Sequence, residues 1–421
     1  MNLQQLDHKI EEKLNSAIYS CIDISHFVFE HAELGGQETK SAAYIADVLK
    51  QYGFSVEFPY GNLAQEKLDE IGMPPGETLE TAFVAEYGEA DAEVTIAFLA
   101  EYDALPGFGP QGQPGHACGH NWIAATMAGC GIALSAAAEE TKCKVRVIGT
   151  PAEETYGAKV NMAKLGVFDH VDFIFQAHLS DKYAMEVPTL AMYSIEFDFH
   201  GKSAHAAINP ETGINALDGV ISMFNSINAL RQHVGRDAIM HGIITEGGVT
   251  SNVIPDFAQC QFEIREKSRG KLDALRGRVI AAAEAAALAT GCKVEYRDYE
   301  NHNDELINLK SMTEICSRYF VEEGIKDFVA EADYKGAGST DLGNVSYICP
   351  TLYAEVKLAD GTPVHVHDRG ALELVDSAAA HESMAAVIRV FAKAACEIAV
   401  DKDKARKIKE EFLEKRSKKL L

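Results

Sequence analysis

Apolar runs alternate with helical stretches over the first 188 residues. Three runs have the pattern of buried strands, namely EVTIAFLAEYDAL (93–105), KVRVIGTPAEE (144–154) and VDFIFQAHLS (171–180). A long Ala-rich helix is predicted between the first two, from Asn121 to about Glu140. Short apolar strands that alternate with helices are typical of a mainly parallel sheet covered on both faces, so this pattern predicts an α/β fold.

The middle of the chain changes to an alternating pattern. SIEFDFHG (194–201) alternates as a half-buried strand does, and a helix follows with apolar residues at helical spacing. The region continues with two strand-like runs, AIMHGIITEGG and FAQCQFEIRE. It ends with a helix over about 268–290 and a last strand, CKVEYRDYE. This β-α-β-β-α-β order predicts a ferredoxin-like α+β domain.

Helix–strand alternation resumes after about residue 303. It predicts a helix over 308–323, a strand in VSYICPTLYAEV (345–356) and an Ala-rich helix over about 376–399. We therefore expect a discontinuous α/β domain, residues 1–188 and 303–421, interrupted by an inserted domain, residues 189–302. The terminal DKDKARKIKEEFLEKRSKKLL is predicted to be a solvated helix.

The composition narrows the classes of function. The 421 residues carry a formal net charge of −24, which argues against nucleic acid or an anionic membrane surface as a partner. No stretch is apolar enough to span a bilayer, and the charged N-terminus lacks the features of a signal peptide. Nine cysteines are scattered without a paired framework, so we expect reduced thiols and a cytoplasmic protein.

Polar side chains end each of the three predicted parallel strands. Glu101 and Asp103 follow the first strand, Glu153 and Glu154 the second, and His178 the third. Ligands of open α/β sheets bind at the carboxyl ends of the strands, so these groups should converge in space.

Two further segments belong to the same edge of the sheet. GHACGHN (115–121) lies between the first strand and the long helix, and PVHVHDRGA (363–371) follows a later strand. Histidine, cysteinate and carboxylate are the ligands that suit zinc and other borderline divalent metals. The candidates outnumber the three or four ligands of one tetrahedral zinc, which favours a two-metal site with a shared thiolate or water.

Each of these signals has a structural alternative. His178 is compatible with a hydrogen-bonded core residue, the Glu153–Glu154 pair with an ordinary surface, and the glycines around Cys118 with a tight turn. A thiol nucleophile at Cys118 with His120 as its base is a further alternative, but it leaves the carboxylates and the other histidines without roles. The joint placement at strand ends favours the metal site, and consecutive side chains that point opposite ways allow one glutamate to bind metal while the other faces the attacking water.

The same segments resemble those of a known family. Four segments occur in the order typical of the M20 family of metallopeptidases: AEYDALPGFG, GHACGHN, PAEE and HGKSAHAA. The similarity extends over essentially the whole chain. GGVTSNVIPD (247–256) and STDLGNVSYICP (339–350) are most similar to the amidohydrolase branch, which holds aminoacylase-like, aminobenzoyl-glutamate hydrolase-like and dipeptidase-like enzymes. The resemblance is specific for the family and not for the substrate.

The resemblance implies a role for each matching residue of the α/β domain. The ligands of a dinuclear centre of divalent ions (Zn, Mn, Co or Ni) would be Cys118, His120, Glu154, His178 and His367. The Cys118 thiolate would bridge the two ions. Glu153 would be the general base that takes a proton from the attacking water and passes it to the leaving amine, and Asp103 would orient the site.

The resemblance also implies that the inserted domain supplies substrate contacts. His205, in GKSAHAA, matches a histidine that stabilises the tetrahedral oxyanion, in many members from the other subunit. Asn252 and Arg265 match positions that contact the substrate carboxylate. The insert is accordingly expected to be a dimerisation and lid domain, and the protein a homodimer.

Some positions depart from the family pattern. Many relatives have Asp directly after the second histidine of the motif, where this chain has Asn121, and Glu101 stands where relatives often have Asp. His367 is predicted to be the last ligand from its spacing to the following helix, with His365 as the alternative because the two share a face of an extended segment. His116 is assigned a structural role.

The resulting hypothesis is a metal-dependent hydrolase that cleaves an amide bond through a metal-activated water. Its substrate would be an N-acyl amino acid, an aminobenzoyl-glutamate-like conjugate or a dipeptide. The alternative is a non-catalytic dimeric protein of the same fold that binds a small ligand or metal, and the intact Glu153–Glu154 pair counts against it.

Overall fold

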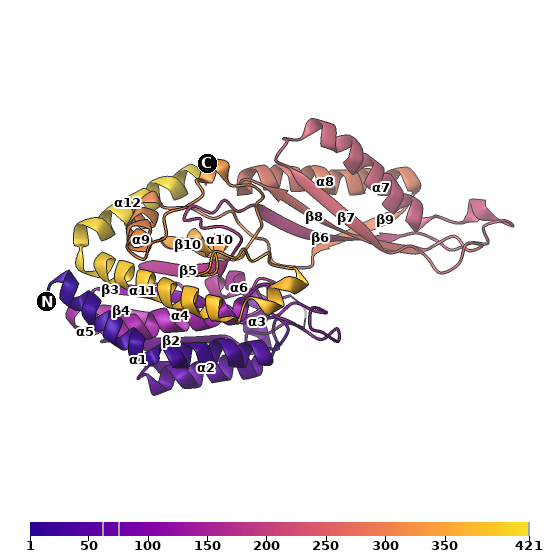
Figure 1. Cartoon of the computed structure of the whole chain (residues 1–421). Coiled ribbons are helices and arrows are strands. Elements are labelled where there is room, and N and C mark those ends of the chain that lie inside the picture. Colours follow the sequence, from indigo (N-terminus) through magenta and orange to yellow (C-terminus); the bar gives the residue numbers. More distant parts are fainter. Residues whose placement is uncertain (61–62, 75, 420–421) are drawn as a thin grey trace. The chain divides into compact units, whose positions relative to one another are not determined.

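The computed structural model describes residues 1–60, 63–74 and 76–419, which fold as two units (Figure 1). The first unit contains Met1–Pro188 and Leu306–Lys418, and the second contains Thr189–Glu305 together with Lys419. No helix in the described ranges has both the length and the apolar composition needed to cross a bilayer.

The first unit is built on a six-stranded sheet with the order β1-β2-β4-β3-β5-β10. Its strands are β1 (Ser55–Glu57), β2 (Phe83–Tyr87), β3 (Val94–Ala100), β4 (Cys143–Gly149), β5 (Phe173–Leu179) and β10 (Thr351–Val356). Strands β4, β3, β5 and β10 are parallel, whereas β2 is antiparallel to β4 and β1 to β2. The predicted α/β class with a mainly parallel sheet is confirmed; the two antiparallel strands were not predicted.

Helices cover both faces of this sheet. They are α1 (Leu3–Glu30), α2 (Thr39–Gln51), α3 (Gln65–Glu70), α4 (His120–Ser135), α5 (Ala138–Thr141), α6 (Ala158–Lys164), α9 (Lys310–Glu322), α10 (Leu342–Ser346), α11 (Ala378–Val400) and α12 (Lys402–Lys419), with short 3-10 turns at Glu331–Asp333 and Arg369–Glu373. Alternate residues of the inner strands enter two cores. In β3, for example, Phe98 packs with α1, α4 and α11, and Leu99 packs with α6 and α10.

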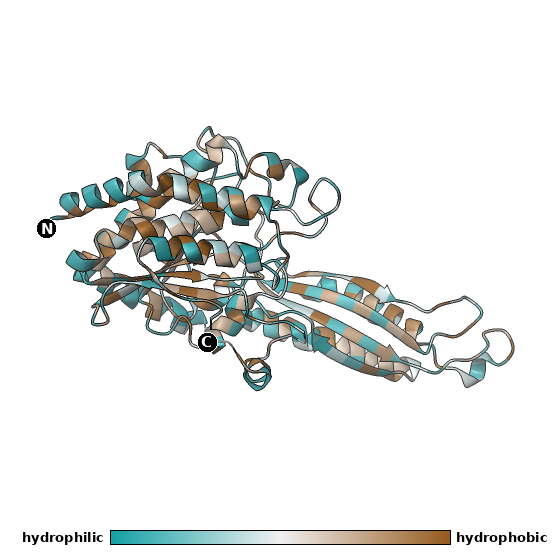
Figure 2. Cartoon of the chain, turned by 90° about the horizontal axis from the view of Figure 1, so that it is seen from below, coloured by the Kyte–Doolittle hydropathy of each residue, from teal (hydrophilic) through white to brown (hydrophobic). Residues whose placement is uncertain are grey.

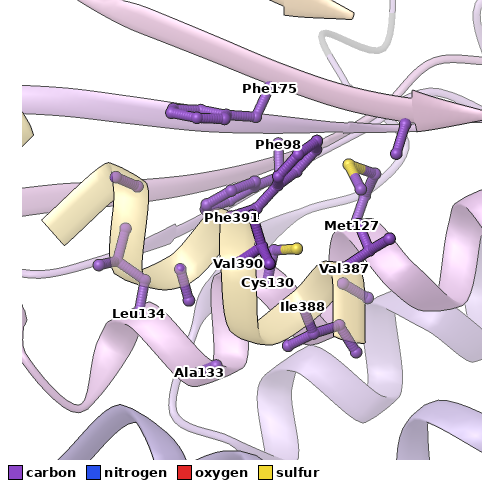
Figure 3. Close-up of a cluster of buried hydrophobic side chains, with 14 of the residues drawn as sticks. Phe98, Met127, Cys130, Ala133, Leu134, Phe175, Val387, Ile388, Val390 and Phe391 are labelled. Atoms are coloured by element: carbon purple, nitrogen blue, oxygen red, sulfur yellow. The ribbon is translucent and has the colours of Figure 1, made fainter. Parts of the chain in front are cut away.

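Figure 3 shows the first of these cores, where the ring of Phe175 contacts both the ring of Phe98 and that of Phe391 on α11. Helix α4 is buried over its whole length, as expected of a helix that is apolar all round. At Gly129, a Cβ atom would lie only 2.4 Å from Ile388 Cδ1, so this glycine allows α4 and α11 to approach closely. This tight packing fixes the helix whose first residue is His120.

The second unit has the predicted β-α-β-β-α-β order. It consists of β6 (Ala191–His200), α7 (Ala216–Leu230), β7 (Ile239–Glu246), β8 (Phe257–Glu266), α8 (Arg269–Thr290) and β9 (Lys293–Asp298), with 3-10 turns at Pro210–Thr212 and Arg231–His233. The antiparallel sheet has the order β7-β8-β6-β9, and α7 and α8 share its core. In Figure 2 its strands show hydrophobic and hydrophilic residues in alternation, as a sheet covered on one face requires.

Three predictions of local structure are wrong in part. The helix predicted over 121–140 ends at Ser135 and is followed by the separate α5. The strand predicted from Val345 begins only at Thr351, because the helix α10 occupies the start of the segment and Pro350 cannot donate a ladder hydrogen bond. Helix α12 is not simply solvated, since Ile408 and Phe412 are buried against the main core.

Candidate metal centre

Four sets of three potential ligands occur in the described residues, two with Glu153 (beside His120 and Glu154, or beside Glu101 and Asp341) and two with Cys118. The two sets with Cys118 meet at the carboxyl edge of the six-stranded sheet. The first set is Cys118, His120 and His178; the second is Cys118, Glu154 and His367. Within each set the ligand atoms lie within 4.8 Å of one another. Cys118 belongs to both sets, so its thiol lies between two potential metal positions.

The histidines of the first set have one ring nitrogen already engaged. Nδ1 of His120 lies 2.8 Å from Asp103 Oδ1, and Nδ1 of His178 lies 2.7 Å from the carbonyl oxygen of Leu179. These acceptors engage Nδ1 of each ring and leave Nε2 as the nitrogen that can bind a metal once it has released its proton. Nε2 of His178 then faces the Cys118 sulfur at 3.4 Å.

The donors present fit a divalent metal. Nε2 of His120 is buried and has no hydrogen-bond partner among the described residues. It lies 3.8 Å from Glu154 Oε1 and 3.7 Å from Glu101 Oε2. A buried polar nitrogen without a partner is costly, and a metal cation between imidazole, thiolate and carboxylate would take the place of its proton and satisfy it.

Local backbone geometry brings the motif residues to this edge. Gly119 caps the N-terminus of α4 with a φ of 81°, a left-handed conformation that glycine adopts without strain, so Cys118 and His120 can be presented from a sharp turn. After β4, the backbone N–H of Glu154 donates to Asp103 Oδ2 at 2.9 Å. Asp103 thus contacts one candidate ligand, His120, at its ring and a second, Glu154, at its backbone.

The two neighbouring glutamates have opposite electrostatics. Burial, and then the charges of Glu101 and Glu154, hold the pKa of Glu153 well above its ordinary range. Burial alone would raise the pKa of Glu154 as well, but a hydrogen bond from His367 and the charge of His120 lower it to about 2. Glu153 is in neither set that contains Cys118.

The structure separates the two histidines of the segment PVHVHDRGA. His367 Nε2 lies 3.2 Å from Glu154 Oε1, and its backbone N–H donates to the carbonyl of Ala117 at 2.9 Å. Its φ of 61° is left-handed, so the chain turns sharply at this residue and the two side chains do not share a face. Both histidines are exposed, but His365 belongs to none of the ligand sets in the described residues.

His116 and Asn121 contact the protein scaffold. His116 is buried with Nε2 3.0 Å from the carbonyl of Val28, and burial followed by the charge of His120 lowers its pKa to about 3. The Asn121 amide donates to Ser25 Oγ at 2.9 Å and to the Val375 carbonyl at 3.2 Å. An aspartate cannot donate to a carbonyl, so this bond explains the Asn at this position.

Glu38 is a supporting residue that the sequence analysis missed. It is fully buried; its Oε1 accepts from the backbone N–H of Ala152 at 2.8 Å and its Oε2 from Thr81 Oγ1 at 2.8 Å. Ala152 has a left-handed φ of 56° directly before the two glutamates. In the sequence, Glu38 is simply an acidic residue before a helix, which gives no indication of this contact.

Lys159 is a second supporting residue that the sequence analysis missed. This fully buried lysine of α6 places Nζ 2.6 Å from Glu101 Oε1 and 2.6 Å from Asp341 Oδ1. Gln176 also donates to Glu101 Oε1 at 2.8 Å. Carboxylate oxygens of Glu101 and Asp341 lie within 4.8 Å of that of Glu153. The buried ion pairs of Lys159 are therefore directly beside Glu153, the residue predicted to be the general base.

Replacing Lys159 by Met is expected to lower the free energy of unfolding by about 3–5 kcal/mol, because it leaves two buried carboxylates unpaired. Denaturant unfolding of the metal-free protein would measure the change. Lys164→Met is the matched control: Lys164 is an exposed lysine of the same helix whose Nζ donates to the Ile71 carbonyl, and its loss should cost about 1 kcal/mol. Equal losses in both variants would contradict a special role for the buried cluster.

The substrate-binding residues predicted in the inserted domain lie in the second unit and at opposite ends of its sheet. His205 and Asn252 are exposed and adjacent, since the N–H of Ala206 donates to the Asn252 carbonyl at 3.0 Å. Arg265 of β8 pairs instead with Met192 near the start of β6. From Met192 to the end of β6 at His200 the strand spans about 26 Å, at about 3.3 Å per residue.

The comparisons with known proteins agree with this fold and site. The family model described as a peptidase dimerisation domain matches residues 189–290. The Xaa-Arg dipeptidase of Mus musculus is 33% identical over 365 residues, which cover 83% of this chain and 79% of that protein. A p-aminobenzoyl-glutamate hydrolase subunit of Escherichia coli is 31% identical over 310 residues, 70% of this chain and 61% of that protein.

Solved structures share the fold at lower identity. An aminobenzoyl-glutamate utilization protein from Klebsiella pneumoniae has a TM-score of 0.69 and 20% identity, covering 93% of this chain and 98% of its own. A dinuclear metal binding peptidase of the M20 family from Bacillus subtilis has a TM-score of 0.60 and 21% identity, with 89% and 98% covered. The fold and the relatives together define an enzyme of the hydrolase class. The chain belongs to the M20 peptidase family.

Proposed function

We propose that this protein is a metal-dependent amidohydrolase that cleaves the amide bond of an N-acyl amino acid, an aminobenzoyl-glutamate-like conjugate or a dipeptide. The observation that carries the proposal is the pair of ligand sets that share Cys118, next to a glutamate, Glu153, that belongs to neither. Relatives named as a dipeptidase, a hydrolase of p-aminobenzoyl-glutamate and an N-acetyldiaminopimelate deacetylase support an amide bond as the target.

The proposed cofactor is a pair of divalent ions (Zn, Mn, Co or Ni), held by the residues of the two sets. When bound, such ions polarise the scissile carbonyl and lower the pKa of a water molecule. Glu153 accepts a proton from the attacking water and returns it to the leaving nitrogen. Asp103 keeps the His120 ring and the Glu154 backbone in place during this transfer.

We further propose that the active form is a homodimer in which His205 and Asn252 come from the partner chain. One small substrate cannot contact both Arg265 and His205 of a single unit, because they lie at opposite ends of its sheet. The edge strand β7 exposes Ile239 and Ile243, which lie on the same face of the strand and form an apolar strip that suits pairing with a second copy. Sedimentation should show a particle of twice the 45.8 kDa chain mass.

In this proposal His205 stabilises the developing oxyanion, and Asn252 and Arg265 bind the substrate carboxylate. The cytoplasm is the proposed compartment, because all nine cysteines lie in the described residues and all are free.

A hydrolysis screen tests the proposed function directly. Protein loaded with Mn or Zn would be incubated with aminobenzoyl-glutamate, N-acetyl amino acids and a set of dipeptides, and the released amine would be quantified. We expect turnover of at least one class and its loss on chelation. Stoichiometric metal without hydrolysis of any class would instead favour the non-catalytic binding protein.

A further inference from the structure

Glu355 of β10 lies beside the candidate metal centre and has no part in it. In the parallel pairing of β10 with β5, Glu355 is opposite His178, and Tyr353 is opposite Gln176. Residues paired across neighbouring strands project from the same face, with the strands about 4.8 Å apart. The rings of Tyr353 and His178 are in edge contact at 6.3 Å, as this shared face requires. The Glu355 side chain therefore projects next to the imidazole that faces Cys118.

Two hydroxyl groups hold the Glu355 carboxylate in a fixed orientation. Ser180 Oγ donates to Oε2 at 2.9 Å, and the Tyr334 hydroxyl donates to Oε1 at 2.6 Å. Burial and the charge of Glu355 raise the pKa of Tyr334, so this hydroxyl keeps its proton and stays a donor. Both donors are neutral, and they orient the carboxylate without cancelling its charge.

No lysine, arginine or histidine of the described residues forms a salt bridge with Glu355. Lys182, whose Nζ lies 4.4 Å from the centroid of the Tyr334 ring, pairs with Asp181 at 2.9 Å, and Lys357, two residues after Glu355, pairs with Asp327 at 2.7 Å. Glu355 is half-buried. A half-buried carboxylate without a cation has lost part of its hydration and has gained no ionic partner in return.

We infer that Glu355 binds a positively charged group of the substrate, an ammonium or a guanidinium, next to the scissile bond. A fixed carboxylate has lone pairs for two or more charge-assisted hydrogen bonds, and these cations supply the matching donors. The inference rests on the proposed function and narrows it. Among the proposed substrates, it favours a cationic dipeptide or N-acyl amino acid over a glutamate conjugate.

The test compares matched substrates in wild-type protein and in the Glu355→Gln variant. Gln keeps the shape of Glu and can still bond to both hydroxyl groups, but it removes the charge. One substrate pair differs only in a C-terminal arginine or citrulline, and a second pair differs only in a free or an acetylated N-terminus. We expect kcat/KM of the cationic member to fall about tenfold or more in the variant, and that of the neutral member to stay within about twofold.

The two pairs distinguish the source of the cation. A loss confined to arginine identifies a side-chain subsite, and a loss confined to the free N-terminus identifies an amino-terminal subsite. Equal losses in all four substrates, or no loss, would overturn the inference. Glu331→Gln is the charge-matched control, because this exposed carboxylate lies three residues before Tyr334. Its loss should leave the ratio of kcat/KM between the cationic and the neutral member of each pair unchanged.

A binding measurement separates this inference from the proposed function. Calorimetric titration of L-arginine and L-citrulline into metal-loaded protein requires no turnover. Glu355-dependent binding of arginine without hydrolysis in the screen would support the subsite and reject the amidohydrolase. Hydrolysis with selectivity that is unchanged in Glu355→Gln would reject the subsite and leave the amidohydrolase standing.

Discussion

The Glu153→Gln variant is expected to lose about 10²–10⁴-fold in kcat, the usual contribution of a positioned general acid–base group. Its metal content should stay at the wild-type level, because neither ligand set that contains Cys118 includes Glu153; loss of metal in this variant would instead favour the set of His120, Glu153 and Glu154. Gln is almost isosteric with Glu but cannot accept the proton of the attacking water. Steady-state kinetics together with elemental analysis of the purified variant would measure both quantities.

Glu154→Gln is the matched control, since it makes the same chemical change one residue further along. This residue lies beside both His120 and His367 and has a strongly lowered pKa, so its variant should lose bound metal along with activity. Full activity in Glu153→Gln, or normal metal with full activity in Glu154→Gln, would contradict the assignment of base and ligand.

The second large effect is expected at His367. His367→Ala should weaken the binding of one of the two ions by at least about 100-fold, since the loss of a mere outer-shell partner already costs about 10–100-fold. Turnover should fall with it, because the remaining ligands of that set are only Cys118 and Glu154. Titration of the metal-free protein, with the number of ions bound per chain as the readout, would measure the change.

His365→Ala is its control. His365 is two residues away, has the same side chain and is equally exposed but belongs to no ligand set of the described residues, so its variant should bind two ions and turn over like the wild type. The reverse result, with metal lost only in His365→Ala, would require a different arrangement of this segment when metal is bound.

Sequence reasoning predicted the convergence of polar groups at the sheet edge for a physical reason. Carboxyl ends of parallel strands lie at one edge, so side chains that directly follow β3, β4 and β5 must approach each other. Asp103, Glu154 and His178 follow or end these strands. In the structure the Glu154 N–H donates to Asp103, and Cys118 shares one ligand set with Glu154 and another with His178. The resemblance to a family added the prediction of which side chains bind metal. Those metal-binding roles stay predictions.

Contacts between residues far apart in the chain were beyond this reasoning. Glu38 meets Ala152 across 114 positions, and Lys159 meets Asp341 across 182. No local spacing encodes such a partner, since each contact depends on how whole helices dock against the sheet. The same holds for Glu355, which was part of a predicted strand and became a candidate subsite only when β10 was paired with β5.

By itself, the sequence determined the alternation of strands and helices, the inserted β-α-β-β-α-β domain and the edge at which the chemistry lies. Periodicity and strand ends are local properties, and a chain carries them in neighbouring residues. The tertiary structure alone decided that His367 rather than His365 lies against Glu154, that Asn121 donates to the Val375 carbonyl, and that His205 and Arg265 are far apart within one unit. The first contact depends on the left-handed backbone of His367, the second on how helices dock, and the third separation on strand register. All three are set by packing over the whole fold.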